Sequence, residues 1–202
     1  MSKHVHSLLC LGDSYTVGEG IPLHQSFPYQ TVQMLRKEGL AFHAPEIVAQ
    51  TGWTTFELAE FLIHHSFEHQ YDFVTLLIGV NNQYRGLEAE DFAEDFEYLL
   101  KKAINLCGSH EKQVVAISIP DWGITPFAKG RNREEISANI DSFNTTASLL
   151  AAKYNVAWLD ITGDYRKNGQ TDGMLASDGL HPSGNLYEQW AMRVKDFIAE
   201  KL

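Results

Sequence analysis

Short apolar runs alternate with segments of helical periodicity along the chain, and this alternation constrains the fold more than any other feature. The runs predict five strands, at Val5–Leu11, Glu46–Ala49, Phe73–Ile78, Gln113–Ile119 and Val156–Asp160. They are largely apolar on both faces, as parallel strands covered on both sides should be. Strands that alternate with helices are typical of a parallel sheet between two helical layers.

Five helices are expected between and after these strands. Pro28 suits a first helical turn and Gly39 a helix end, which places one helix near Phe27–Glu38. The others are marked by apolar stripes at helical spacing, namely Phe56, Ala59, Leu62 and Ile63; Phe92, Phe96, Leu99, Leu100 and Ala103; Ile136, Ile140, Phe143, Ala147 and Leu150; and Leu186, Trp190, Val194, Phe197 and Ile198. The pattern predicts a three-layer α/β/α sandwich with strand order 2-1-3-4-5, in flavodoxin fashion. With no repeat or linker, we expect residues 1–202 to form a single domain.

Charge and composition exclude several classes of protein. The net charge of −10 argues against a nucleic-acid surface and against docking on anionic lipid. The apolar run before Gly12 is too short for a secretory signal, and no segment approaches the roughly 20 apolar residues of a membrane helix. Two cysteines are too few for a disulfide framework. We expect a cytoplasmic protein with reduced thiols, Cys10 in the first strand and Cys107 near a helix end.

Polar residues gather in the loops that follow the predicted strands. In parallel sheets with helices on both faces, ligands bind outside the carboxyl ends of the strands. There the chain places Ser14, Gly52, Asn81, and, in a longer loop before the last helix, Asp178 and His181. A serine hydroxyl needs a base, the base needs a partner, and an oxyanion needs preformed donors. The five residues can fill these roles.

Each residue also has a purely structural interpretation. Ser14 could be a helix cap, because serine accepts from free N–H groups at helix starts. The segment from Asp178 to His181 could be a polar turn, Gly52 a turn glycine, and Asn81 a helix cap. Asp13 is an alternative acid for the site, but neighbouring side chains diverge, so we expect it to tie the loop backbone together.

Four blocks in one order resemble the GDSL or SGNH hydrolases, over most of the chain. They are Gly12-Asp13-Ser14, Gly52, Gly79-Val80-Asn81 and Asp178-Gly179-Leu180-His181. The resemblance implies Ser14 as nucleophile, His181 as base and Asp178 as the orienting acid. It also implies an oxyanion hole made by Ser14, Gly52 and Asn81.

The chain departs from the family pattern at two positions. Tyr15 stands where leucine is frequent, at a variable position to which we assign no catalytic role. Asn82 replaces the aspartate that usually ends the third block, which loses a charge and puts the rigidity of that loop in question.

Other motifs carry less weight. His64, His65 and His69 suggest a metal but have no carboxylate at ligand spacing, so a solvated face is expected. Ser109–Lys112 matches Ser-x-x-Lys, but it lies at the amino end of the sheet. "GEGIPL" lacks the third glycine of a dinucleotide fingerprint, and a Gly-x-Ser-x-Gly elbow is absent.

These observations predict ester hydrolysis through an acyl-enzyme on Ser14, with no metal or organic cofactor and a small-molecule ester as substrate. The loop Pro120–Arg133 carries Trp122, Ile124 and Phe127, which could cover a small acyl group or a sugar ring. We therefore expect short acyl groups on a sugar or another small alcohol. A thioesterase, a lysophospholipase or an acyltransferase with the same site is the alternative within enzymes, and a non-catalytic binding module is the alternative outside them.

Overall fold

The computed structural model describes residues 4–67, 69–87 and 89–202, so the first three residues of the N-terminal stretch lie outside it. Within these ranges five strands form one parallel sheet in the order β2-β1-β3-β4-β5. The strands are β1 (Leu8–Gly12), β2 (Glu46–Ala49), β3 (Phe73–Leu77), β4 (Val114–Ile117) and β5 (Ala157–Leu159). The predicted strand order and direction are confirmed.

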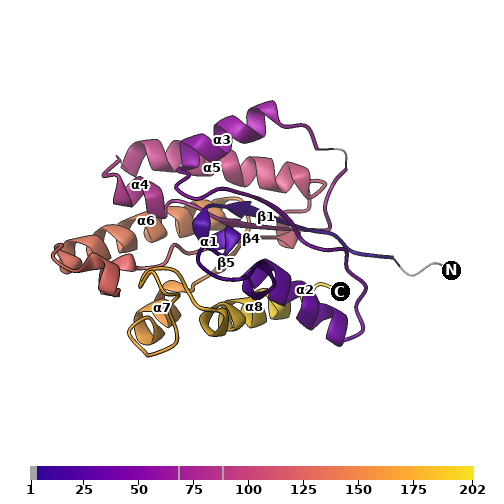
Figure 1. The fold of residues 1–202 in the computed structure, drawn as a ribbon. Coiled ribbons are helices and arrows are strands. Elements are labelled where there is room, and N and C mark those ends of the chain that lie inside the picture. The colour runs from indigo at the N-terminus through magenta and orange to yellow at the C-terminus, as the bar shows by residue number, and fades with distance from the viewer. Residues whose placement is uncertain (1–3, 68, 88) are drawn as a thin grey trace.

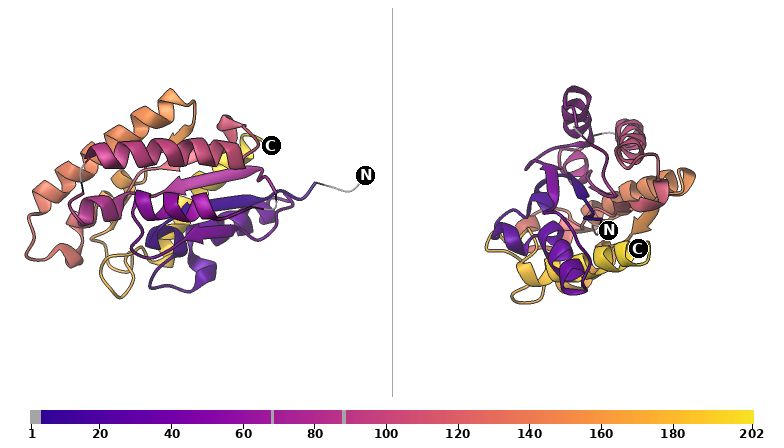
Figure 2. Two further views of the ribbon diagram at one scale, coloured as in Figure 1. Left: turned by 90° about the horizontal axis from the view of Figure 1, so that it is seen from above. Right: turned by 90° about the vertical axis from the view of Figure 1, so that its right-hand side faces the viewer.

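Five longer helices cover the two faces of the sheet (Figure 1). They are α2 (Phe27–Lys37), α3 (Thr55–His64), α5 (Ala89–Leu106), α6 (Arg133–Lys153) and α8 (Gly184–Ala199). On one face α2 packs against α8; on the other α3 and α6 both pack against α5. Figure 2 shows the two layers on opposite sides of the strands, which confirms the three-layer fold. None of the helices in the described part of the chain has the length and apolarity needed to cross a membrane.

Three short helices each follow a strand directly and lie at the carboxyl edge of the sheet. They are α1 (Ser14–Val17) after β1, α4 (Val80–Tyr84) after β3, and α7 (Thr162–Asn168) after β5. Such helices have only one or two turns and show no readable apolar period, so the sequence did not predict them. They shape the loops in which the polar blocks of the sequence lie.

The central strands form the core, and both cysteines lie where they were expected. Every residue of β1 and β3 is buried. Cys10 is fully buried in β1, Cys107 directly follows α5, and both thiols are free. Burial raises the pKa of the Cys10 thiol to about 12, so it stays protonated at neutral pH.

The apolar stripe predicted for α3 is wrong at two of its four positions. Phe56 and Ile63 are 58% and 61% exposed, whereas the buried face runs through Thr55, Leu58 and Leu62, with Ala59 between them. Thr55 lies inside because its backbone N–H donates to the Asn82 side chain and its hydroxyl donates to Asp95. Polar groups whose hydrogen bonds are satisfied can lie on the buried face of a helix. The hydrogen bonds of Thr55 therefore set an orientation of α3 that differs from the expected one.

The strand bounds differ by one to three residues from those predicted, except for β2. The largest change is at β1, which begins at Leu8 rather than at Val5. The residues before it run extended, but their pairing is limited to an isolated bridge between His6 and Phe42. The chain enters β1 from the end of the sheet opposite to α1 (Figure 1).

Candidate active site

The turn after β1 explains why the chain leaves this strand through Gly-Asp-Ser. A Cβ atom on Gly12 would lie 2.1 Å from the Thr16 hydroxyl and 2.4 Å from the Leu77 carbonyl oxygen, so only glycine fits. Asp13 caps α1, because its carboxylate accepts from the Tyr15 N–H at 3.0 Å. The interpretation of Ser14 as the helix cap is therefore wrong, and Asp13 ties the loop backbone as expected.

Ser14, His181 and Asp178 form one hydrogen-bonded series. The Ser14 Oγ atom lies 2.9 Å from His181 Nε2, and His181 Nδ1 lies 2.6 Å from Asp178 Oδ2. Ser14 and His181 are 5% and 7% exposed. The other carboxylate oxygen of Asp178 accepts from the backbone N–H groups of Leu180 and His181. The carboxylate is thus fixed by its own loop and holds the imidazole toward the serine.

The environment of Asp178 keeps this carboxyl ionised. Partial burial opposes ionisation, but the bond to His181 and the two backbone N–H groups outweigh it and hold the pKa of Asp178 below its usual value. At neutral pH the group therefore accepts hydrogen bonds only, so it selects the histidine tautomer whose proton is on Nδ1. In that tautomer Nε2 is free to accept the serine proton.

Tyr15 has a contact that the sequence did not suggest. Its ring lies 4.8 Å from the His181 ring and is itself packed near Trp190 and Tyr165. We assigned the position no catalytic role, and nothing in the sequence predicted this contact with the histidine. The Tyr15 ring, held by Trp190 and Tyr165, packs beside the imidazole on the side of α8 and limits its rotation.

Ser14, Gly52 and Asn81, the three residues expected to form the oxyanion hole, line the same pocket. Ser14 opens α1, and the first N–H groups of a helix have no partner inside it. Gly52 has a φ of +85°, a left-handed conformation that favours glycine, in the turn after β2. Asn81 Nδ2 donates to the Trp53 carbonyl oxygen at 2.9 Å, which leaves its second N–H for another acceptor. Asn81 is not a helix cap, since Gly79 occupies that position of α4.

Arg85 was missed by the sequence reasoning and braces the Gly52 turn. Its guanidinium donates to the Gly52 carbonyl oxygen and pairs with Glu57 at 3.0 Å. Glu57 in turn closes a capping box with Thr54 at the start of α3. The sequence held one indication of this role, because on a helix Arg85 would lie on the same face as Asn81, four positions earlier.

Asn82, the second departure from the family pattern, holds the loop rather than loosening it. It is buried, its Oδ1 accepts from the Thr55 N–H at 3.0 Å, and its Nδ2 donates to the Thr55 hydroxyl at 2.7 Å. These bonds join the start of α4 to the start of α3, next to the Asn81 and Gly52 donors. The amide thus supplies the rigidity that the lost charge put in question.

A pocket of about 180 Å³ opens above the serine. Its lining includes Ser14, Gly52, Asn81 and His181, together with the polar Thr51. The other lining side chains are aromatic or aliphatic, namely Tyr15, Val80, Tyr84, Trp122, Phe127 and Leu180. Tyr84 was not anticipated, and Ile124 is not among these lining residues. Trp122 is buried, and its indole N–H donates to Gln83 at 2.6 Å. Phe127 is 43% exposed at the rim.

The loop that carries Trp122 is held in place by the buried carboxylate of Asp121. Asp121 accepts from the Gly123 N–H at 2.9 Å and the Ser137 hydroxyl at 2.6 Å, and pairs with Arg166 at 2.8 Å. The loop between β4 and α6 is therefore fixed from beneath, so the pocket wall is rigid in place.

The motifs that were set aside lie away from this pocket. His64, His65 and His69 are exposed, and Ser109 precedes β4 at the amino edge of the sheet, both as expected. Within the described ranges, the side chains close enough to share a metal ion are a different group: His4, His6 and Asp72.

A serine, histidine and aspartate bonded in series at the carboxyl edge of a parallel sheet are the arrangement found in hydrolases that use a serine nucleophile. The chain belongs to the GDSL-like lipase/acylhydrolase family, whose sequence model matches residues 10–189. It is therefore a carboxylic ester hydrolase, and the resemblance noted in the sequence is confirmed.

Solved structures of this fold cover nearly the whole chain. TesA has a TM-score of 0.76 at 20% identity, over 97% of this chain and 99% of its own. A lipase/acylhydrolase from Enterococcus faecalis has a TM-score of 0.75 at 22% identity, over 97% of each chain. Axe2, an acetylxylan esterase from Geobacillus stearothermophilus, has a TM-score of 0.75 at 17% identity, over 98% of this chain and 96% of its own. No curated protein sequence matches the chain.

Proposed function

We propose that the protein removes short acyl groups from small-molecule or carbohydrate esters through an acyl-enzyme on Ser14. The observation that carries the proposal is the series from Ser14 through His181 to Asp178, closed at 2.9 and 2.6 Å. Both distances are within hydrogen-bond reach, which is the geometric requirement for a nucleophile and its base.

The first half of the reaction acylates the serine. His181 Nε2 takes the hydroxyl proton as Ser14 Oγ attacks the ester carbonyl carbon, and Asp178 stabilises the imidazolium that forms. The carbonyl oxygen becomes an oxyanion, which accepts from the N–H groups of Ser14 and Gly52 and from Asn81 Nδ2. The tetrahedral intermediate collapses, the C–O bond to the alcohol breaks, and the alcohol leaves with the proton from His181.

The second half releases the acid. Water occupies the place of the alcohol, His181 takes one of its protons, and the oxygen attacks the acyl carbon. The ester bond to Ser14 breaks, and the hydroxyl recovers its proton from His181. The chain, the ester and one water molecule supply every group that these steps use.

The size of the pocket supports a short acyl group. At about 180 Å³ it is smaller than the roughly 300–1,000 Å³ pockets that enclose drug-sized ligands. Trp122 closes one side, and its bond to Gln83 together with the buried Asp121 beneath the loop resists enlargement. A long acyl chain would have to run past Phe127 into solvent.

The rim supports a sugar or another small alcohol as leaving group. Tyr84 and Phe127 are 41% and 43% exposed there, so each presents part of a ring on which a sugar can stack. The similarity in fold to an acetylxylan esterase makes an acetylated carbohydrate the first natural ester class to test.

The test is kcat/KM across p-nitrophenyl esters from acetate to palmitate. We expect the highest values between acetate and hexanoate, and a shift toward longer chains in Phe127→Ala, which removes a half-exposed ring from the rim. Phe56→Ala is the matched control, because Phe56 is an exposed phenylalanine on α3 outside the pocket. A maximum at dodecanoate or longer would overturn the short-acyl assignment and favour a lysophospholipase.

A further inference from the structure

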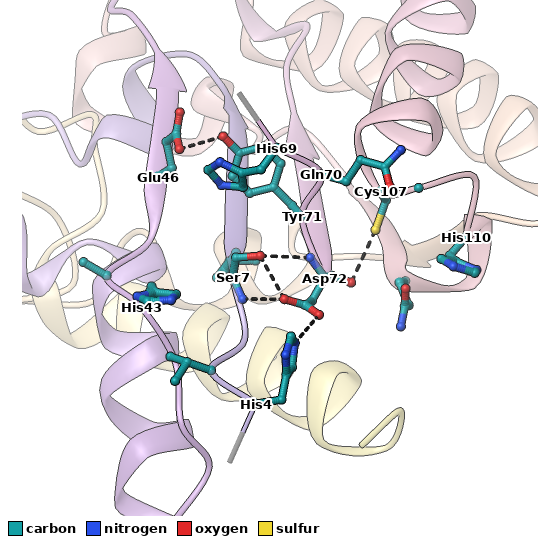
Figure 3. A pocket seen from close by; sticks show the side chains of 15 residues that line it. His4, Ser7, His43, Glu46, His69, Gln70, Tyr71, Asp72, Cys107 and His110 are labelled. Carbon is teal, nitrogen blue, oxygen red and sulfur yellow. Dashed lines mark hydrogen bonds and ion pairs between the residues drawn. The ribbon is translucent and has the colours of Figure 1, made fainter. Parts of the chain in front are cut away.

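A second and larger pocket lies at the amino edge of the sheet, at the opposite end of β1 from Ser14. It measures about 720 Å³, and its lining includes the histidines His4, His43, His69 and His110 (Figure 3). The ester chemistry proposed for the carboxyl edge uses none of these side chains. Imidazoles gathered with carboxylates in this way are the usual ligands of borderline metal ions.

Three side chains at this edge converge on one point. His4 and His6 stand two positions apart in an extended segment, so they lie on the same face of it. Asp72 directly precedes β3, and the register that pairs Leu8 with Phe73 brings it beside that segment. His4 Nε2 lies 2.8 Å from Asp72 Oδ1, and His6 Nδ1 lies 3.7 Å from the same oxygen. The three atoms lie within 4.8 Å of one another.

The spacing of these atoms is close to that of a metal coordination sphere. A tetrahedral zinc ion with bonds of about 2.0–2.1 Å holds its ligand atoms roughly 3.3 Å apart. The His4–Asp72 separation is slightly shorter than this and the His6–Asp72 separation slightly longer, and the exposed His4 side chain has room to rotate. His6 Nδ1 is a buried atom without a hydrogen-bond partner among the described residues. A metal ion would supply the partner that this nitrogen lacks.

The carboxylate is already oriented for this purpose. Asp72 Oδ2 accepts from the Ser7 N–H at 2.8 Å and the Ser7 hydroxyl at 2.9 Å, which turns Oδ1 toward the two histidines. Figure 3 shows His4 and Ser7 directed at the Asp72 carboxylate from two sides. Ligands held by outer hydrogen bonds of this kind are a regular feature of metal sites.

We propose that His4, His6 and Asp72 bind a divalent transition-metal ion of the zinc class, with water in the fourth position. Two imidazoles and one carboxylate suit Zn²⁺, whereas Mg²⁺ and Ca²⁺ prefer all-oxygen ligand sets. The site joins the segment before β1 to the start of β3, far along the strands from the serine. Its role is to fasten this segment to the sheet, and it takes no part in ester hydrolysis.

The test is calorimetric titration with Zn²⁺ of protein that carries no polyhistidine tag, together with thermal unfolding. We expect one Zn²⁺ per chain, no binding of Mg²⁺, and a rise in Tm of about 5–10 °C at 100-fold excess over Kd. His4→Ala and Asp72→Asn should each weaken Zn²⁺ binding by at least about 10-fold.

The control variants are His43→Ala and His110→Ala, which remove imidazoles from the same pocket but outside the cluster, and both should bind Zn²⁺ as the native protein does. If Asp72→Asn fails to fold, the result for His4→Ala tests the proposal, because the His4 side chain is 65% exposed and its loss removes little buried surface. An absence of Zn²⁺ binding, or equal binding by His4→Ala and the native protein, would overturn the proposal.

Discussion

His181 Nε2 lies 2.9 Å from Ser14 Oγ, although the two residues are 167 positions apart in the chain. The contact joins the loop after β1 to the loop before α8, the two ends of the structural unit. If this pair acts as nucleophile and base, neither residue can catalyse the reaction without the other. The losses in kcat caused by their substitutions are then not additive.

Ser14→Ala and His181→Ala should each lower kcat by up to about 10⁶-fold, and the double variant should lose little more than either single one. The reason is that the serine and the imidazole act as a unit in one proton transfer. Steady-state kinetics on p-nitrophenyl acetate measures all three. Ser109→Ala, at the exposed serine of the Ser-x-x-Lys motif, is the control and should retain full activity. Additive losses would mean that the two residues act separately.

Asn81→Ala should lower kcat by about 10²–10³-fold with little change in KM, because it removes a donor to a charge that exists only in the transition state. The variant also loses the bond to the Trp53 carbonyl, so thermal unfolding should be recorded beside the kinetics. A rise in KM at unchanged kcat would instead assign Asn81 to substrate binding.

Asp178→Asn should lower kcat/KM by about 10²–10⁴-fold without unfolding the loop. The amide keeps the oxygen that accepts from the Leu180 and His181 N–H groups, but it no longer selects the required imidazole tautomer. Because the pKa of Asp178 lies below its usual value, its protonation contributes nothing to any loss of activity between pH 5 and 8. Asp172→Asn makes the same charge change at an exposed position earlier in the same loop, between α7 and α8, and should be neutral. Near-native activity of Asp178→Asn would contradict the orienting role.

The buried cap of α1 predicts a dependence of stability on pH. Burial raises the pKa of Asp13 to about 7, although the Tyr15 N–H favours its charged form. The unfolded chain releases this proton near pH 4, so the folded state binds more protons between pH 4 and 7. The contribution of Asp13 to stability is therefore full below pH 4 and falls by about 4 kcal/mol as pH rises through 7.

Asp13→Asn keeps the oxygen that accepts from Tyr15 but cannot ionise. Urea unfolding at pH 5 and pH 8 should show a smaller loss of stability in this variant than in the native protein. An identical loss in both would mean that Asp13 does not carry the pH dependence.

Much of the site could be predicted because the topology of the sheet, rather than the details of side-chain packing, determines where its residues lie. Once the strands are recognised as parallel, the loops that carry Ser14, Gly52 and Asn81 must meet at one edge. Asp178 and His181 lie three residues apart in one loop, so their contact is local. The predicted strand order rests on analogy with flavodoxin-type sheets, which share this alternation of strands and helices.

The parts that could not be predicted depend on contacts between distant segments. Phe56 is exposed because the Asn82 amide fixes the inner face of α3 at Thr55, 27 residues away. The spacing of Arg85 from Asn81 indicates a shared helix face, but its bond to the Gly52 carbonyl crosses two loops and no local pattern predicts it. His4 meets Asp72 only through the register of β1 against β3, which no local pattern encodes.

The most direct test of the account is labelling with a fluorophosphonate, which phosphonylates serine hydroxyls that an adjacent base has activated. The account predicts one adduct per chain by intact mass, mapped by peptide analysis to Ser14, and much slower labelling in His181→Ala. A binding module without catalysis would not be labelled. An adduct of equal yield in Ser14→Ala, or no adduct on native protein that hydrolyses p-nitrophenyl acetate, would contradict the central claim.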